Sequence, residues 1–468
     1  MKTATLLTMV LLTGCAVGPN YQPPKTVAPV RWAEPTLGGT TNRSAQLAHW
    51  WQNFNDPELD SLIGRAIKAN HDLRLATGRL HEARAQQAGG RWDLLPTLDG
   101  SASYLDARSS KDAQIFPIDK INTDTYDAHF DATWELDVFG GKRRGVEALD
   151  ATVAATEADR RDVFVSVLAE VARNYVELRG YQRRLAIARD NIAAQQAALD
   201  LTRTRFQGGI SSQLDVAQAA ALLAGTQSQL PVLRAATQQT LHRLAVLIGQ
   251  PPDALLVELA PENAIPAVPP EVPVGLPSEL LRRRPDVRRA ERQLAATTAR
   301  RGVETAELFP KFSLVGTAGL QSLSFSDWFT GGSRYWSAGP TVTWRLFELG
   351  RIRSQIKAAN AREEQALAVY EKAVLFALED VENALVNYAQ EQDRRRSLRE
   401  QVAANRQSVE LANQLYSKGS SNFLEVLDAK RSLYRAEDDL AQSDRAVTIN
   451  LIMLYKALGG GWADNHVE

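Results

Sequence analysis

The chain contains an internal repeat, which limits its possible folds more than any other feature. The segment FQGGISSQLDV at 206–216 aligns with YSKGSSNFLEV at 416–426, 210 residues later. At the same spacing, WEL at 134–136 aligns with WRL at 344–346. A pattern repeated at this distance indicates two copies of one structural unit. We expect these copies over 57–249 and 277–459.

A proline-rich segment separates the two copies. Residues 250–276 include Pro251-Pro252 and Pro269-Pro270. Proline cannot donate a main-chain hydrogen bond, so this composition fits neither a long helix nor a central strand. We therefore expect an extended linker over 250–276, followed after the second copy by a short C-terminal tail over 460–468.

Each copy contains segments in which apolar and polar residues alternate with the period of a β-strand. In a soluble sandwich the polar face of such strands meets water and the apolar face meets a core. In an outer-membrane barrel the apolar face meets lipid and the polar face lines the lumen. The alternation of apolar and polar residues is by itself compatible with both folds. Strand pairs are expected over 97–105 with 126–138 and over 312–321 with 335–347, and the apolar face includes Phe130, Trp134, Trp336 and Trp344.

Long helical patterns follow the strands in both copies. Apolar residues recur every seven positions over about 142–207, which is typical of coiled-coil packing, and a helix of that length spans about 100 Å. In the second copy Arg395 interrupts the same series. Shorter helices are expected over 58–92, 213–248 and 423–458, so that one long helix packs against two shorter ones in each copy. The hairpin tips are expected near 208–212 and 419–422.

The N-terminus has the features of an exported lipoprotein. Lys2 precedes a short apolar run that ends in LTGC, and Cys15 is the only cysteine of the 468 residues. The run is too short to span a bilayer, which favours a cleaved signal peptide over 1–14. LTGC resembles a lipobox, in which Cys15 becomes the lipid-modified N-terminus of a segment over 15–56. The following Ala16 favours the outer membrane over retention at the inner membrane.

Four amphipathic strands cannot close a barrel, and open strand edges are excluded from lipid. Several chains must therefore contribute. Two chains would give eight strands, whose interior is largely filled by side chains. Three chains would give twelve strands and leave room for water.

Several motifs together carry a resemblance to a known family. They are the lipobox followed by VGPNYQPP, then WWQNFNDPELDSLI, LRRRPDVRRAE and the twofold strand–helix repeat. The chain resembles the TolC-like outer-membrane efflux lipoproteins of resistance-nodulation-division pumps along nearly its whole length. The resemblance implies an α+β membrane protein: a homotrimer with a twelve-stranded transmembrane β-barrel, four strands per chain, continued by a long periplasmic α-helical barrel. An equatorial belt, which would hold the linker, surrounds the helices.

The resemblance also implies a function and sites. It predicts a passive outer-membrane exit duct that works with a periplasmic adaptor and an inner-membrane transporter, without catalytic chemistry. The family's periplasmic gate maps onto Leu424 and Asp428, where three leucines would form an apolar constriction and three aspartates a cation-favouring ring. The first copy carries Gln218 at the position of Asp428. The expected adaptor contacts at the hairpin tips are Gly209, Ser212, Gly419 and Ser420.

Other functions receive less support from the sequence. The net charge of −1 gives no basic field for nucleic acid. The chain has no phosphate-binding GxxxxGK loop and no HExxH metal motif, so we expect no metal and no cofactor apart from the lipid on Cys15. Two alternatives remain: the outer-membrane channel of a type I secretion system, and a lipid-anchored tether that spans the periplasm without conducting.

Overall fold

A computed structural model describes residues 16–25, 29–33, 39–41, 43, 47–110 and 122–462. The predicted signal peptide over 1–14 and the predicted lipid-attachment residue Cys15 lie outside these residues, as does most of the tail over 460–468. The chain divides into two compact units. The strand unit comprises the described residues of Met1–Lys25, Arg79–Thr156 and Arg289–Glu371, and the helical unit those of Thr26–Gly78, Glu157–Arg288 and Lys372–Glu468.

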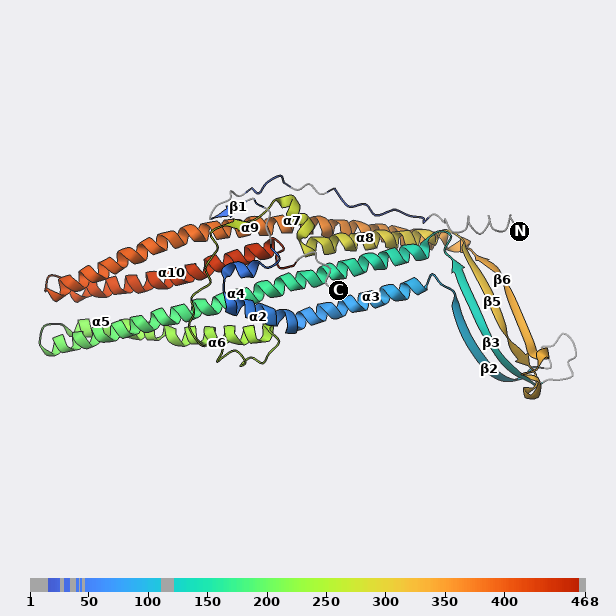
Figure 1. Ribbon diagram of the computed structural model, residues 1–468, viewed down its shortest axis with the longest axis horizontal. Coiled ribbons are helices and arrows are strands. Elements are labelled where there is room, and N and C mark those ends of the chain that lie inside the picture. Colours follow the sequence, from blue (N-terminus) through green and yellow to red (C-terminus); the bar gives the residue numbers. More distant parts are fainter. Residues whose placement is uncertain are drawn as a thin grey trace. The chain divides into compact units, whose positions relative to one another are not determined.

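The strand unit contains one four-stranded antiparallel sheet, to which each copy of the repeat contributes a hairpin (Figure 1). The strand order is β2-β3-β5-β6, so the two hairpins pair along β3 and β5, and β2 and β6 are the sheet edges. Phe130 lies opposite Ala318, and Ala318 opposite Trp336. The strands are β2 (Thr97–Arg108), β3 (Asn122–Leu136), β5 (Lys311–Ser322) and β6 (Arg334–Thr343).

One face of this sheet is apolar and open to the surroundings. The pairing puts even-numbered residues of all four strands on the same face. On that face Trp336 is 79% exposed, Leu98 69% and Phe130 63%. The odd-numbered face carries mostly polar side chains, of which Asp127 is buried. The period-two pattern therefore assigned the two faces correctly.

Two of the predicted strands extend too far. The strand predicted over 126–138 ends at Leu136, because the Asp137 carboxylate turns to accept the backbone N–H groups of Lys142 at 3.1 Å and Arg143 at 2.8 Å. It thereby caps the long helix that follows. The strand predicted over 335–347 ends at Thr343, since the chain leaves the extended conformation at Arg345 (ψ 64°) and forms the short helix η5 (Leu346–Glu348).

The long helices are present in both copies. They are α4 (Gly141–Gln207) with 67 residues and α9 (Leu349–Ser417) with 69 residues, and each has residues in both units. No helix among the described residues combines the length and apolar character needed to cross a membrane. The shorter helices are α2 (Pro57–Ala69), α3 (His71–Trp92), α5 (Gln213–Gln227), α6 (Gln229–Leu247), α7 (Pro277–Arg283), α8 (Pro285–Ala306) and α10 (Phe423–Ala457).

The helix predicted over 58–92 is two helices, α2 and α3, because Asn70 interrupts it. Asn70 has an extended backbone (ψ 131°), its side-chain oxygen accepts the N–H groups that begin α3, and its amide donates to the Leu247 carbonyl at 2.8 Å. Arg284 occupies the equivalent break between α7 and α8, before Pro285, and donates to the Ala457 carbonyl at 3.1 Å. In the second copy Pro285 causes the break, because a residue before proline avoids the helical backbone conformation. The two copies therefore have a break at the same position for different reasons.

The helix predicted over 213–248 is also divided, into α5 and α6 at Ser228. Pro231 follows in the first turn of α6. Its ring lacks an N–H group and would clash with the carbonyl of Gln227, four residues earlier, and Gln227 is the last residue of α5. The second copy has no proline here, and α10 continues unbroken.

In the helical unit the two hairpins, α4–α5 and α9–α10, share a core near their tips, and their loops lie at the same end of the unit (Figure 1). Leu199 and Leu223 of the first hairpin pack with Phe423, Val426 and Leu427 of the second. The helical unit also contains a short parallel pairing of β1 (Thr40–Thr41) with β4 (Val272–Pro273), which joins the N-terminal segment to the linker.

Candidate functional site

The two hairpin tips have the same backbone geometry. Gly209 and Gly419 adopt left-handed conformations with φ of 73° and 72°. The next N–H group turns back to a carbonyl five residues earlier, from Ile210 to Arg205 at 2.8 Å and from Ser420 to Leu415 at 3.0 Å. This is the Schellman arrangement, which satisfies the last carbonyls of a helix.

Capping side chains begin the return helices. In the first copy Ser212 and Asp215 form a reciprocal capping box. In the second copy the Asn422 side chain accepts the Glu425 N–H at 3.1 Å. Gly209, Ser212 and Gly419 therefore shape the tips, and Ser420 lies in the turn. A contact of these four residues with an adaptor stays a prediction.

The predicted gate residues lie on the exposed face of α10. Leu424 is 47% exposed, whereas the adjacent Phe423, Val426 and Leu427 are buried in the tip core. Asp428 lies one turn after Leu424 on the same exposed face and pairs within its own helix with Arg431 at 3.5 Å. An exposed pair of this kind contributes at most about 1 kcal/mol. Both residues are thus available to another chain, while their role as a gate stays a prediction.

Contacts between the two hairpins were not predicted from the sequence. Arg184 of α4 binds Asp438 of α10 with two hydrogen bonds of 2.7 and 3.0 Å. Nearby, a Cβ atom on Gly180 would lie 2.5 Å from the Arg445 side chain, so only glycine allows this approach. Closer to the tips, the Arg205 guanidinium lies 4.4 Å from the Tyr416 ring centroid. The sequence signal for this contact was Gly180, because a glycine inside a long heptad series marks close packing.

Aromatic side chains mark both ends of the apolar sheet face. At one end the indole N–H groups of Trp134 and Trp344 donate to the carbonyls of Leu94 and Leu308 at 3.0 and 3.1 Å. At the other end an aromatic cluster contains Tyr104, Tyr126, Phe325, Trp328 and Phe329.

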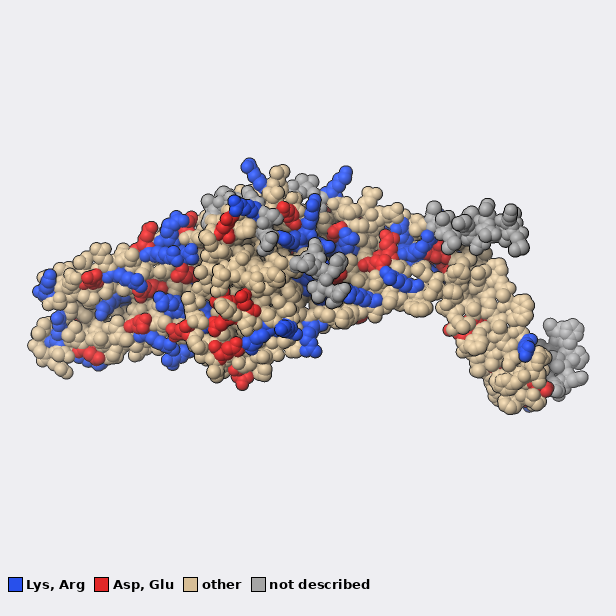
Figure 2. Space-filling model, viewed as in Figure 1, with Lys and Arg blue, Asp and Glu red and all other residues tan. Residues whose placement is uncertain are grey.

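The distance between these two groups fits the length of strand that crosses a membrane in a barrel. Tyr126 and Trp134 are the first and last of nine residues of β3, or about 26 Å along the strand. Barrel strands are tilted and cross the membrane in about 9–11 residues, and aromatic girdles border the lipid-facing band. Figure 2 shows few charged residues on the sheet surface in view, in contrast to the helices.

The segment that follows Cys15 is fixed to the strand unit. The Val17 N–H donates to the Phe139 carbonyl at 3.0 Å, next to the end of β3. Arg144, whose side chain is 5% exposed, donates to the Val17 carbonyl at 3.2 Å and to the Asn20 side chain at 2.6 Å. The VGPN motif therefore packs against the start of α4.

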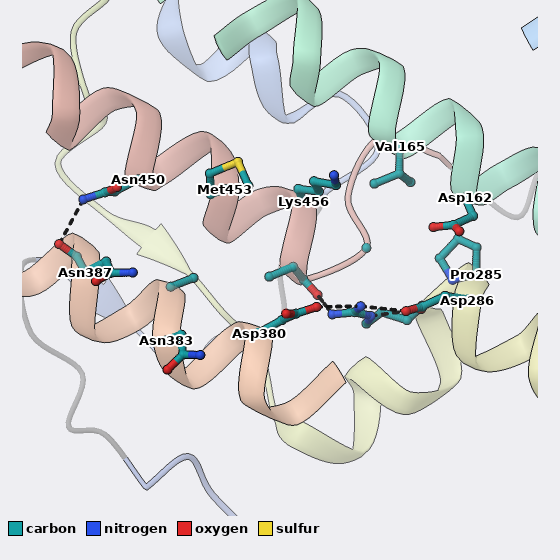
Figure 3. A pocket seen from close by; sticks show the side chains of 14 residues that line it. Asp162, Val165, Pro285, Asp286, Asp380, Asn383, Asn387, Asn450, Met453 and Lys456 are labelled. Atoms are coloured by element: carbon teal, nitrogen blue, oxygen red, sulfur yellow. Dashed lines mark hydrogen bonds and ion pairs between the residues drawn. The ribbon is translucent and has the colours of Figure 1, made fainter. Parts of the chain in front are cut away.

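A cavity of about 330 Å³ lies in the helical unit at the break between α7 and α8 (Figure 3). Asp286 and Asp380 both point to the Arg284 guanidinium, at 2.7 and 2.9 Å. Burial lowers the pKa of Arg284, but the hydrogen bonds and charges of these carboxylates raise it above its ordinary value. Arg284 and its two carboxylates therefore form a structural ion-pair network. No group of three or more His, Cys, Asp or Glu residues in the described parts could hold a metal ion.

Comparisons with known proteins agree with this geometry. The family model "Outer membrane efflux protein" matches residues 62–250 and 276–460. Pyoverdine export outer membrane protein OpmQ of Pseudomonas aeruginosa is 34% identical, and the match covers 99% of this chain and 97% of that protein. Nodulation protein T of Rhizobium leguminosarum bv. trifolii is 32% identical, with 97% and 96% covered.

Solved structures give the same result. The outer-membrane channel OprN superimposes with a TM-score of 0.90 at 38% identity, over 96% of this chain and all of that one. The open state of the MtrE outer membrane channel of Neisseria gonorrhoeae superimposes with a TM-score of 0.82 at 28% identity, over 96% and 99%. The chain therefore belongs to the outer membrane efflux protein family, and it acts in efflux at the outer membrane.

Proposed function

We propose that three copies of this chain close a twelve-stranded barrel and form a passive exit duct. The observation that carries the proposal is the four-stranded sheet with an exposed apolar face and two edges, β2 and β6, that pair with no further strand of the described residues. Unpaired edges are not tolerated in lipid, so β2 of one copy pairs with β6 of the next. Eight strands would be filled by side chains, whereas twelve leave a lumen.

The helices continue this duct into the periplasm and close it at the hairpin tips. Leu424 and Asp428 lie on a face of α10 that the single chain leaves exposed. In a trimer, three copies of each residue form an apolar constriction and an anionic ring. The Arg184–Asp438 contact joins the two hairpins, so any movement that separates them must break it.

The duct serves a pump and performs no catalysis of its own. Relatives include a solvent efflux pump outer membrane protein, SrpC, and a toluene efflux pump outer membrane protein, TtgI, both of Pseudomonas putida. We infer that an inner-membrane transporter supplies the energy and that a periplasmic adaptor binds the tips at Gly209, Ser212, Gly419 and Ser420. A lipid on Cys15 anchors the N-terminal segment, whose VGPN motif binds Arg144 at the start of α4.

The barrel proposal is tested by counting chains. Native mass spectrometry of the detergent-purified protein should give three chains, each with the mass of the sequence from Cys15 plus acyl groups. A monomer or dimer as the largest species would contradict the barrel. An unmodified N-terminus that retains residues 1–14 would contradict the lipid anchor alone.

A further inference from the structure

The polar face of the sheet contains a histidine between two carboxylates. The His129 Nδ1 contacts the Asp127 carboxylate, and its Nε2 lies 2.9 Å from the Asp131 carboxylate. Both acids are on the same strand, two residues before and after the histidine. The Asp127 side chain is only 10% exposed. The imidazole ring is therefore held at both of its nitrogen atoms by acidic groups.

Residues of the neighbouring strands β5 and β6 leave room for this histidine and bind its two acids. Gly319 of β5 lies opposite His129, and a Cβ atom there would lie 2.5 Å from the His129 Cβ, so glycine makes the room. Across Gly319, the Tyr335 hydroxyl of β6 donates to Asp127 at 3.1 Å. Two further side chains of β5 bind the acids, Gln321 to Asp127 at 3.1 Å and Thr317 to Asp131 at 2.5 Å.

Strand β2, which pairs with the other side of β3, adds another acid. Asp99 of β2 lies directly opposite Asp131, and Ser101 lies opposite His129. Like charges directly opposite each other destabilise a sheet, and an imidazolium at position 129 offsets this repulsion. We call Asp99, Asp127, His129 and Asp131, with their partners Thr317, Gln321 and Tyr335, the His129 cluster.

The His129 cluster occurs in only one copy of the repeat. The equivalents of Asp127, His129 and Asp131 in the second copy are Ser337, Gly339 and Thr341, which carry no charge. The common strand fold therefore does not require these charged groups.

We propose that the His129 cluster sets the ion selectivity of the barrel lumen and makes it depend on pH. With a protonated histidine the three carboxylates leave a charge of −2 per chain, and with a neutral histidine −3. Acidic rings favour cations, and histidine is the side chain that changes charge near neutral pH. Cation preference therefore rises with pH. This proposal rests on the trimeric barrel proposed above, in which the summed charge of the three His129 clusters changes from −6 to −9.

The test is the reversal potential of single trimers in a planar bilayer under a potassium chloride gradient, at pH 5 and pH 9. The wild-type ratio of cation to anion permeability should rise about twofold between these values, as the lumen charge becomes more negative. His129→Gln should give the high ratio at both pH values, and His129→Lys, with its permanent cation, the low ratio at both. A structural role alone would not separate the two variants in opposite directions.

Controls distinguish this proposal from the function it rests on. His81→Gln, on the exposed surface of α3, should keep the wild-type pH dependence. If His129→Lys does not assemble, Asp131→Asn should still lower the ratio at pH 9. A wild-type pH dependence that persists in His129→Gln would overturn the role of His129 while the duct stands. No current from well-folded wild-type trimers would overturn both.

Discussion

Trp134 in the first copy of the repeat and Trp344 in the second make the same contact, since each indole donates to an equivalent carbonyl, of Leu94 or Leu308. Asp428 in the second copy has no such counterpart, because the first copy carries Gln218 there. Similarly, Gly209 and Gly419 form identical turns, whereas His129 corresponds to Gly339.

The comparison separates two kinds of position. The tryptophans at the end of the sheet and the glycines of the hairpin tips act alike in both copies. The charged residues that we assign to the duct, in the gate and in the His129 cluster, occur in one copy only. Variants of equivalent positions can therefore test whether a residue serves the common fold or a single copy's function.

The largest effect is expected for a charge on the apolar sheet face. Trp134→Asp and Trp344→Asp should both strongly impair assembly. Each substitution removes the packed part of an indole and its hydrogen bond, and it places a charge at the edge of the lipid-facing band, in total about 2–4 kcal/mol in each chain. The matched control is Glu135→Gln, on the opposite face of the same strand. The measurement is the amount of heat-labile trimer on gels, and equal tolerance of all three variants would count against a lipid-facing sheet.

A smaller effect is expected at the two helix breaks. Arg284→Ala leaves two carboxylates without their guanidinium. It should cost about 2–3 kcal/mol, less than the roughly 3–5 kcal/mol of a broken fully buried pair, since Asp380 is half exposed. Asn70→Ala removes a helix cap and one hydrogen bond, or about 1–2 kcal/mol. The dissociation temperature of the trimer should therefore fall further for Arg284→Ala. The reverse order would contradict the assigned contacts.

The smallest effect concerns Glu58, in the first turn of α2. Burial raises the pKa of Glu58, but hydrogen bonds from Asn263, Arg179 and Tyr175 and the charge of Arg179 lower it below its ordinary value. Its contribution to stability is present at neutral pH and is lost as the pH falls through the lowered pKa.

Between pH 7 and pH 3 the dissociation temperature of the wild-type trimer should therefore fall further than that of Glu58→Gln, whose side chain cannot titrate. The matched control is Glu262→Gln, which removes an exposed carboxylate that pairs with Arg189. An identical pH dependence of the wild type and Glu58→Gln would show that Glu58 does not contribute.

Much of the fold could be predicted because periodicity and repeat spacing are properties of the sequence. The long helices, the strand faces and the tip glycines all follow from local patterns. The ends of β3 and β6 were missed, because Asp137 serves as a helix cap, which a period-two pattern does not distinguish from a strand residue. The break at Asn70 was missed because a single asparagine fits a helical pattern until its distant partner, Leu247, is known.

The site was predictable to different degrees. Leu424 and Asp428 came from the resemblance to a family; both are exposed on α10, and their role as a gate stays a prediction. The Arg184–Asp438 pair spans two hairpins, so no local pattern indicates it. The His129 cluster was visible only as alternating charges, because its meaning depends on the register that brings Gly319 and Tyr335 beside it.

The most direct test of a duct closed at its tips is single-channel conductance of purified trimers, with Asp428→Ala compared with Gln218→Ala. The wild type should show a small conductance that favours cations. Asp428→Ala should increase the conductance or reduce its selectivity, and Gln218→Ala should behave as the wild type. Equal behaviour of all three proteins would contradict the gate, and no conductance from well-folded trimers of any of them would contradict the duct.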